Sequence, residues 1–402
     1  YRYADPERAK KEVFNAEHRQ VAREIAAQSF VLLKNKDNIL PIQKKGTIAL
    51  IGPLADNKEN MAGTWSVAGR FDQAVSLSEG LRKAVGDKAN IIYAKGANVV
   101  ADSLLESRVS IFGKPTYRDN RPAEMLIQEA LAAAKNADVI VAALGESAEM
   151  SGESSSRTDI QLPENQRDLL KALLKTGKPV VMVLFTGRPL ALTWEEENVP
   201  AILNVWFAGS EAGDAIADVL FGDVNPSGKL SMTFPQNIGQ VPLFYNHKNT
   251  GRPLADGKWF EKFRSNYLDV SNDPLYPFGY GLSYTSFSYS DVKISNATPK
   301  GNQTITASVT LTNTGAVTGK EVVQLYIRDV VGTVTRPVKE LKGFQKVELK
   351  AGESKTVSFA ISPKDLMFYN YELKYGWEAG EFHVMIGGNS KDVKMGKVNW
   401  SK

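Results

Sequence analysis

The amino-acid sequence predicts an α/β fold, in which a mostly parallel sheet is covered by helices on both faces and is followed by an all-β sandwich. Two patterns carry this prediction. Up to about residue 235, unbroken apolar runs alternate with amphipathic helical patterns, which is typical of parallel strands buried on both faces. From residue 287 onward, apolar and polar residues alternate, as in strands with one face in a core. A chain of 402 residues also exceeds one ordinary core, so two domains are expected.

The α/β domain is predicted to span residues 16–235, after a linker at residues 1–15. Its first helix is indicated by apolar residues that recur on one face, and its first strand stops at the turn signal Gly52-Pro53. Residues 96–120 look irregular. The predicted strands are 47–51, 90–93, 138–144, 179–185 and 201–206, and the predicted helices are 16–30, 76–85, 122–135, 164–175 and 211–221.

After residue 235 the character of the chain changes. Residues 236–286 are rich in Pro, Gly, Tyr and Phe with little periodicity, and we expect this connecting segment to pack against a domain surface. Residues 287–402 then read as about seven short strands, which favours an immunoglobulin-like or fibronectin type III-like sandwich. The clearest strands are 304–313, 321–328, 339–348, 355–361 and 381–386.

Composition narrows the class of protein. The net charge of +4 is spread over 49 basic and 45 acidic residues with no dense basic run, which does not favour nucleic-acid binding. No apolar run is long enough for a transmembrane helix. There is no cysteine, and the three histidines are far apart, so no metal site is expected. The dinucleotide and Walker patterns are also missing, and we expect no cofactor.

The chemistry-bearing stretch is residues 143–162, a polar loop between a buried strand and a helix. Such loops, beyond the carboxyl end of a strand, are where α/β proteins place their chemistry. Glu153 lies among small residues that would let its carboxyl approach a sugar ring, although from the residues alone it can also be a solvated loop carboxylate. We interpret Glu146 and Glu149 as solvated carboxylates. Arg157 can pair with a ligand or, as is commoner, with one of these glutamates.

A second candidate is Trp65, which follows the first strand in the Gly-containing run 62–69. Sugars stack on exposed aromatic faces, so Trp65 can be a carbohydrate platform or a partly buried packing residue. A serine esterase is not supported, because Gly145-Glu-Ser lacks the final glycine of a nucleophile elbow, and no histidine is placed to complete a triad.

Several runs together carry a resemblance to a known family. They are Phe30-Val-Leu-Leu-Lys-Asn35 with Leu40-Pro41, Ile51-Gly-Pro-Leu-Ala-Asp56, Gly187-Arg-Pro-Leu190, Trp206-Phe-Ala-Gly-Ser-Glu-Ala-Gly213, Ala215-Ile-Ala-Asp-Val-Leu-Phe-Gly-Asp223, Asn225-Pro-Ser-Gly-Lys-Leu230 and Tyr276-Pro-Phe-Gly-Tyr-Gly-Leu-Ser-Tyr284. In this order they resemble the second domain of glycoside hydrolase family 3, closest to its bacterial periplasmic β-glucosidases. The resemblance covers nearly the whole chain and runs through a fibronectin-like domain.

The resemblance implies a retaining glycosidase that uses two carboxyl groups. In this family an Asp on an N-terminal (β/α)₈ barrel is the nucleophile, and a Glu on a loop of the second domain is the general acid/base. Glu153 occupies that position and keeps its spacing to Arg157, although Ser154-Ser-Ser156 replaces the Gly-Tyr-Asp that is common in relatives. Trp65, Ser66 and Arg157 are then expected to bind substrate. Some relatives have a second Trp four residues after the first, where this chain has Gly69.

No barrel precedes Tyr1 in this sequence, so the chain alone is expected to be inactive and to need a barrel in cis or on a separate chain. The expected function of the complete protein is hydrolysis of terminal non-reducing β-D-glucosyl residues, in the periplasm or after secretion. The alternative is a non-catalytic carbohydrate-binding or scaffold module. Since neither a Met nor a signal peptide starts the sequence, we expect a processed chain or a piece of a longer one. Sugar and linkage preference and a homodimeric state are left open.

Overall fold

The computed structural model describes residues 5–66, 69–109, 114–255 and 257–402. The chain divides into two compact units, Tyr1–Gly228 and Lys229–Lys402. The first is an α/β unit and the second is built of antiparallel strands, so the predicted fold class is confirmed. Within the described residues, no helix is both long and apolar enough to cross a membrane.

The first unit is organised around a sheet that has six strands among the described residues, in the order β1-β6-β5-β4-β2-β3. Neighbouring strands are parallel, except that β1 at one edge pairs antiparallel with β6. The central strands β4 and β5 are buried along almost their whole length, as their apolar sequences predict. The strands are β1 Val31–Asn35, β2 Gly46–Ile51, β3 Ala89–Ala94, β4 Val139–Gly145, β5 Val180–Phe185 and β6 Ala201–Asn204.

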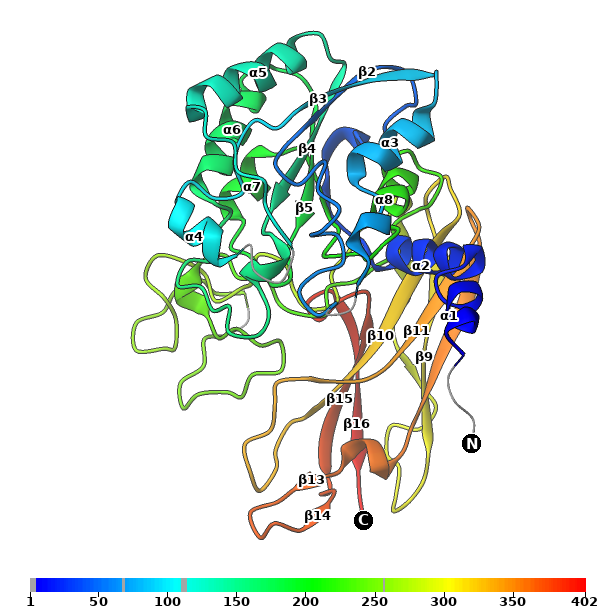
Figure 1. Ribbon diagram of the computed structural model, residues 1–402. Coiled ribbons are helices and arrows are strands. Elements are labelled where there is room, and N and C mark those ends of the chain that lie inside the picture. Colours follow the sequence, from blue (N-terminus) through cyan, green and yellow to red (C-terminus); the bar gives the residue numbers. More distant parts are fainter. Residues whose placement is uncertain (1–4, 67–68, 110–113, 256) are drawn as a thin grey trace. The chain divides into compact units, whose positions relative to one another are not determined.

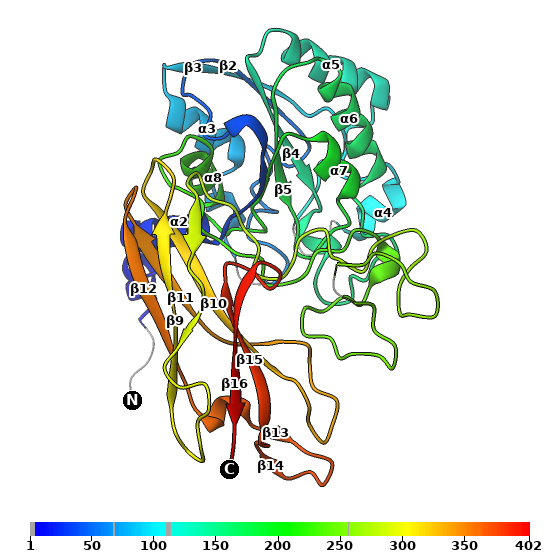
Figure 2. The ribbon, with the colours of Figure 1, turned by 180° about the vertical axis from the view of Figure 1, so that it is seen from behind.

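Helices cover both faces of this sheet. Figures 1 and 2 show α5 and α6 on one face, and α3 and α8 on the other. On the second face α3 packs against α8, and α8 also contacts α2. The helices are α1 Pro6–Glu12, α2 Ala16–Ser29, α3 Leu77–Val85, α4 Ser103–Arg108, α5 Ala123–Lys135, α6 Glu164–Leu174, α7 Thr193–Asn198 and α8 Ala212–Leu220.

Three short helices differ from the sequence expectation. The segment 1–15, predicted as a linker, contains α1, while residues 1–4 lie outside the described residues. The stretch 96–120, predicted to be irregular, contains α4, and α7 was not predicted at all. The sequence of α7, Thr-Trp-Glu-Glu-Glu-Asn, is short and charged, so it offers no apolar periodicity to read.

The strand order locates the functional edge of the sheet. From β2 the chain passes to β3 on one side, whereas β4, β5 and β6 extend from the other side of β2. The direction of winding therefore reverses between β2 and β4, and α/β sheets bind ligands beyond the carboxyl ends of strands at such a point. The loop after β2, residues 52–66, carries Trp65, and the loop after β4, residues 146–157, carries Glu153.

The second unit is an antiparallel sandwich preceded by a long irregular segment. One sheet has the order β11-β10-β15-β16, and the other contains β12-β9-β7 with β8 on β9. Their inner faces bury a core that includes Leu311, Val323, Ile386 and Trp400. Figure 2 shows these strands from behind. They are β7 Phe287–Tyr289, β8 Lys293–Ile294, β9 Ile305–Asn313, β10 Gly319–Asp329, β11 Glu340–Leu349, β12 Ser354–Ile361, β13 Phe368–Tyr369, β14 Tyr375–Gly376, β15 Gly380–Gly387 and β16 Val393–Trp400.

Part of the irregular segment packs within the second unit, as its aromatic residues predict. Tyr245 stacks on Phe278 with ring centroids 4.2 Å apart and meets Tyr326 of β10 edge-on at 5.8 Å. Phe234 contacts Tyr276 in a similar edge-on arrangement. These contacts use the apolar faces of large rings to order a stretch that has little secondary structure of its own.

Candidate active site

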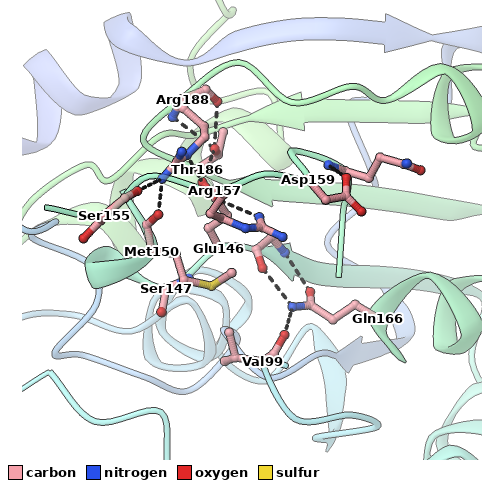
Figure 3. A network of polar contacts seen from close by, with 12 residues as sticks. Val99, Glu146, Ser147, Met150, Ser155, Arg157, Asp159, Gln166, Thr186 and Arg188 are labelled. Carbon is pink, nitrogen blue, oxygen red and sulfur yellow. Dashed lines mark hydrogen bonds and ion pairs between the residues drawn. The ribbon is translucent and has the colours of Figure 1, made fainter. Parts of the chain in front are cut away.

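The loop that follows β4 leaves the sheet at Gly145. A side chain cannot stand at this position, because its φ is +135° and a Cβ atom would lie 1.9 Å from the carbonyl oxygen of Phe185. Gln166 of α6 binds both backbone groups of this glycine. Its Oε1 accepts from Gly145 N at 2.8 Å, and its Nε2 donates to Gly145 O at 2.8 Å and to Val99 O at 2.6 Å. The point where the loop begins is therefore fixed by a neighbouring helix (Figure 3).

Glu146 forms the centre of a buried polar network (Figure 3). Its side chain is fully buried, and Arg157 Nη1 donates to its Oε1 at 2.7 Å. On the other oxygen, Arg188 Nε donates to Oε2 at 3.3 Å and the Thr186 hydroxyl lies 3.1 Å away. The prediction that Glu146 is a solvated carboxylate is therefore wrong. Two guanidinium groups and a hydroxyl replace the water that it would lose on burial.

Arg188 also holds the far side of the loop. Its Nη2 donates to the carbonyl oxygen of Ser155 at 2.7 Å and to that of Met150. These two carbonyls lie on either side of Glu153 in the sequence, so one guanidinium ties down both stems of the loop tip. Because Arg188 follows β5, the shape of the loop after β4 depends on the neighbouring strand.

Glu149 is also buried, so the prediction that it is solvated is wrong too. It lies in a short 3₁₀ turn, Ala148–Met150, and only 8% of its side chain is exposed. Lys114 Nζ donates to Glu149 Oε1 at 2.9 Å, and the Thr64 hydroxyl donates to Oε2 at 2.9 Å. Apart from Arg157, which lies 11 residues from Glu146, the side-chain partners of the two glutamates are 35 to 85 residues away in the sequence, so the loop sequence gives little local signal of their burial.

Glu153 stands in contrast to these two carboxylates. It lies at the exposed tip of the loop, and among the described residues its carboxylate has no hydrogen bond or ion pair. The residue before it, Gly152, has a φ of +124°, and a Cβ atom there would lie 2.3 Å from the Thr64 methyl group. The tip is therefore packed against the loop after β2, while the carboxylate of Glu153 is free to meet another group.

Trp65 lies next to this contact. Its side chain is 71% exposed, so Trp65 does not pack in the core. Ser66, which was predicted to bind substrate, donates its hydroxyl to Gly63 O at 2.9 Å and so shapes the turn that presents Trp65. A further bond joins the two loops, because Ala148 N donates to Asn60 Oδ1 at 2.7 Å. The structure thus brings together the loops that carry Trp65 and Glu153.

Arg157 is both a network member and a wall of a cavity. Its bond to Glu146 is the carboxylate pairing that the sequence favoured, and about a fifth of the side chain stays exposed. A cavity of about 410 Å³ adjoins it, and its other polar lining includes Asp159, Gln161, Glu164 and Arg167. Among the described residues, no group of His, Asp or Glu side chains is arranged to hold a metal ion.

Sequence reasoning missed several residues that build the site. Lys114, Thr64, Thr186 and Gln166 were not singled out, and Arg188 entered only as part of a family motif. Each acts on the loop after β4 from a different element, 21 to 85 residues away in sequence. The motif Gly187-Arg-Pro was the only signal that could have pointed to one of them.

The loops after β2 and β4 thus present an exposed tryptophan and an exposed carboxylate beyond the carboxyl ends of neighbouring strands. Two protein-family models match the sequence of this chain. Residues 30–284 match the glycosyl hydrolase family 3 C-terminal domain, and residues 321–390 match a fibronectin type III-like domain. The chain therefore belongs to glycoside hydrolase family 3.

Individual relatives agree with this assignment. The chain is 52% identical over 379 residues to a periplasmic beta-glucosidase of Salmonella typhimurium, covering 94% of this chain and 49% of the relative. It is 42% identical to a beta-xylosidase of Formosa agariphila, covering 93% of this chain and 49% of that protein. A crystal structure of beta-glucosidase from Listeria innocua in complex with isofagomine superposes with a TM-score of 0.87 at 39% identity, covering 98% of this chain and 51% of that one. The chain thus spans about half the length of the curated relatives it matches.

Proposed function

We propose that this chain is part of a retaining, exo-acting β-glucosidase that removes terminal non-reducing β-D-glucosyl residues, and that Glu153 is its general acid/base. The single observation that carries the proposal is the contrast within one loop. Glu146 and Glu149 are buried and bonded, whereas Glu153 is exposed at a tip that is braced on both stems. A carboxyl that must reach a glycosidic oxygen needs both that freedom and that rigid support.

In the proposed reaction, Glu153 acts twice. Its carboxyl gives a proton to the glycosidic oxygen as a second carboxylate attacks the anomeric carbon, so the leaving sugar departs as an alcohol and a glycosyl-enzyme forms. The Glu153 carboxylate then takes a proton from water, whose oxygen attacks the anomeric carbon and releases the second carboxylate. We assign the second carboxylate to an Asp on a (β/α)₈ barrel, in cis or on a separate chain, since relatives extend to about twice this length.

Two further roles belong to this proposal. Trp65 offers an exposed ring on which the sugar on the leaving-group side can stack, beside the tip that carries Glu153. The proposed location is the periplasm or the exterior of a bacterial cell, which is supported by the periplasmic relative.

The test is Glu153→Ala in a complete protein that contains both a barrel and this chain. Turnover of substrates with poor leaving groups, such as cellobiose, should fall by about 10²- to 10⁴-fold, because the leaving oxygen receives no proton. With 2,4-dinitrophenyl β-glucoside the leaving group needs no acid, so the glycosyl-enzyme should accumulate. Azide should then restore turnover by forming the glucosyl azide.

Asp159→Asn is the matched control, since Asp159 is an exposed carboxylate two residues beyond that loop, and an amide can keep its bond to Gln161 N. It should leave both substrates unaffected. The isolated 402-residue chain is the blank and should show no turnover. Unchanged cellobiose kinetics in Glu153→Ala would refute the assignment, and turnover by the isolated chain would refute the shared active site.

A further inference from the structure

Lys114 and Glu149 form a buried ion pair beneath the loop tip. Their side chains are 1% and 8% exposed, and Nζ lies 2.9 Å from Oε1. Burying two charges costs several kcal/mol of solvation, and apolar residues of similar volume often give equal or greater stability. A contribution to stability is therefore a weak explanation for this pair, and its contacts with neighbouring residues indicate another role.

Both members of the pair bind the same residue. Glu149 Oε2 accepts the Thr64 hydroxyl at 2.9 Å, and Lys114 Nζ donates to the Thr64 carbonyl oxygen at 3.3 Å. Lys114 Nζ also lies 5.2 Å from the centroid of the Phe71 ring, a distance at which a cation is attracted to the ring face. Side chain and backbone of Thr64 are thus fixed together, so the residue can neither rotate nor shift without breaking a buried polar contact.

Thr64 in turn connects Trp65 and Glu153, the two residues to which the proposed function gives a role. It directly precedes Trp65 in the sequence, and its methyl group fills the space where Gly152, the residue before Glu153, would carry a Cβ atom. The charged pair therefore acts one residue away from the exposed ring on one side and one residue away from the exposed carboxylate on the other.

We propose that Lys114 and Glu149 are positioning residues that hold Trp65 at a fixed place relative to Glu153, and so set the affinity for the leaving sugar. This inference rests on the proposed function. A sugar that stacks on Trp65 can offer its glycosidic oxygen to Glu153 only if the two loops keep one spacing. Neither residue of the pair needs to touch the substrate, since both act through Thr64.

The experiment is a double-mutant cycle in the complete protein. One arm is Trp65→Ala and the other is the neutral pair Lys114→Met with Glu149→Gln, which avoids leaving a single buried charge. Each arm alone should raise the KM for cellobiose by about tenfold. The combination should raise it no further, because the pair affects the leaving sugar by fixing, through Thr64, the place of the Trp65 ring. For 2,4-dinitrophenyl β-glucoside, which lacks a leaving sugar, the kinetics of both arms should match those of the parent.

Thr64→Val provides a second variant should the neutral pair unfold the protein. It keeps the methyl contact with Gly152 and removes only the bond to Glu149, and it should give the same selective rise in KM. Three results would each overturn the inference. They are increases in KM that multiply in the combined variant, equal increases in KM for both substrates, and an unchanged KM for cellobiose in either arm. The Glu153→Ala result separates the two levels. If Glu153→Ala loses turnover of cellobiose while the KM increases of the two arms multiply, only the positioning role fails. If Glu153→Ala keeps the turnover of the parent, the proposed function itself fails.

Discussion

Two strands of this molecule, one in each unit, end beside a buried carboxylate, and the two carboxylates have opposite surroundings. Glu146, directly after β4, is fully buried, and both of its oxygens have donors in Arg157, Arg188 and Thr186. Asp329, the last residue of β10, is 7% exposed, but within the part of the chain that the structure describes its Oδ2 accepts no hydrogen bond.

The weaker pairing of Asp329 raises the pKa of its carboxyl group. Its nearest cation is Arg336, with Nε 3.6 Å from Oδ2, and that guanidinium also binds Glu340 at 2.8 Å. Burial raises the pKa of Asp329 from its ordinary value of 3.8 to about 6, only partly offset by Arg336. Burial alone therefore does not mark a functional carboxylate. What distinguishes the two carboxylates is the number of hydrogen-bond and ion-pair donors that stabilise the ionised form of each.

The largest expected change in stability comes from removing the charge of Glu146, the well-paired carboxylate. Glu146→Gln leaves Arg157 and Arg188 partly buried without their counter-charge, and should lower the free energy of unfolding of the first unit by about 3–5 kcal/mol. Urea titration at neutral pH measures the loss. The exposed Glu124 of α5 supplies the control, since Glu124→Gln should change stability by less than about 0.5 kcal/mol. Equal small effects in both variants would show that the network does not stabilise the loop.

The opposite sign is expected for Asp329→Asn. In the folded chain this carboxyl holds its proton up to about pH 6, whereas unfolded it ionises near 3.8, so ionisation penalises the folded state as the pH rises between these values. The amide removes that penalty, and at pH 7 the second unit should gain up to about 3 kcal/mol. Below about pH 4 the gain should vanish. Urea titrations at pH 7 and pH 4 test this, and a gain that is equal at both values would contradict the stated cause.

The smallest effect is expected from Thr186→Val, which keeps the shape of the side chain but removes its hydroxyl. Glu146 Oε2 would lose one partner at 3.1 Å while keeping Arg188, and the backbone N–H of Arg188 would lose the hydroxyl that accepts from it at 3.1 Å. The free energy of unfolding should therefore fall by about 1–2 kcal/mol. Combining Thr186→Val with Glu146→Gln should cost less than the sum of the two, because both changes act on one network. Strict additivity in urea titrations would show that Thr186 and Glu146 are not coupled.

Much of the fold was predictable because its signals are local. The strands β4 and β5 are continuous apolar runs, and α6 begins after Pro163 and ends shortly before Gly177, as the sequence indicates. The strand β16 was missed, since Lys394 and Lys397 interrupt its apolar residues and only its pairing with β15 makes it a strand. Such tertiary pairing leaves little trace in a single sequence.

The candidate site was predictable only in part, for the same physical reason. Glu153 and Trp65 were identified from small neighbours, a glycine-containing loop and the family resemblance, and their roles stay predictions. The pairing of Arg157 with a glutamate of the same loop was predicted. The burial of Glu146 and Glu149 was not, because their other cationic partners, Arg188 and Lys114, lie 42 and 35 residues away in the sequence. A charge in a polar loop looks solvated until the fold supplies the partner that removes its water.

The hold of Arg188 on the carbonyls of Met150 and Ser155 has a consequence for protein engineering. Residues 145–157 do not encode their own shape, so grafting them onto another scaffold would transfer the carboxylate without its orientation. A transferable unit would have to include residues 186–188 from the neighbouring strand and Gln166 from the following helix. The tip itself is less constrained, with one exception: Ser154 has a φ of +61°, so directed evolution should accept glycine or asparagine there more readily than a β-branched residue or proline. Ser155 and Ser156 can be varied more widely, provided that the backbone carbonyl of residue 155 stays where the guanidinium can reach it.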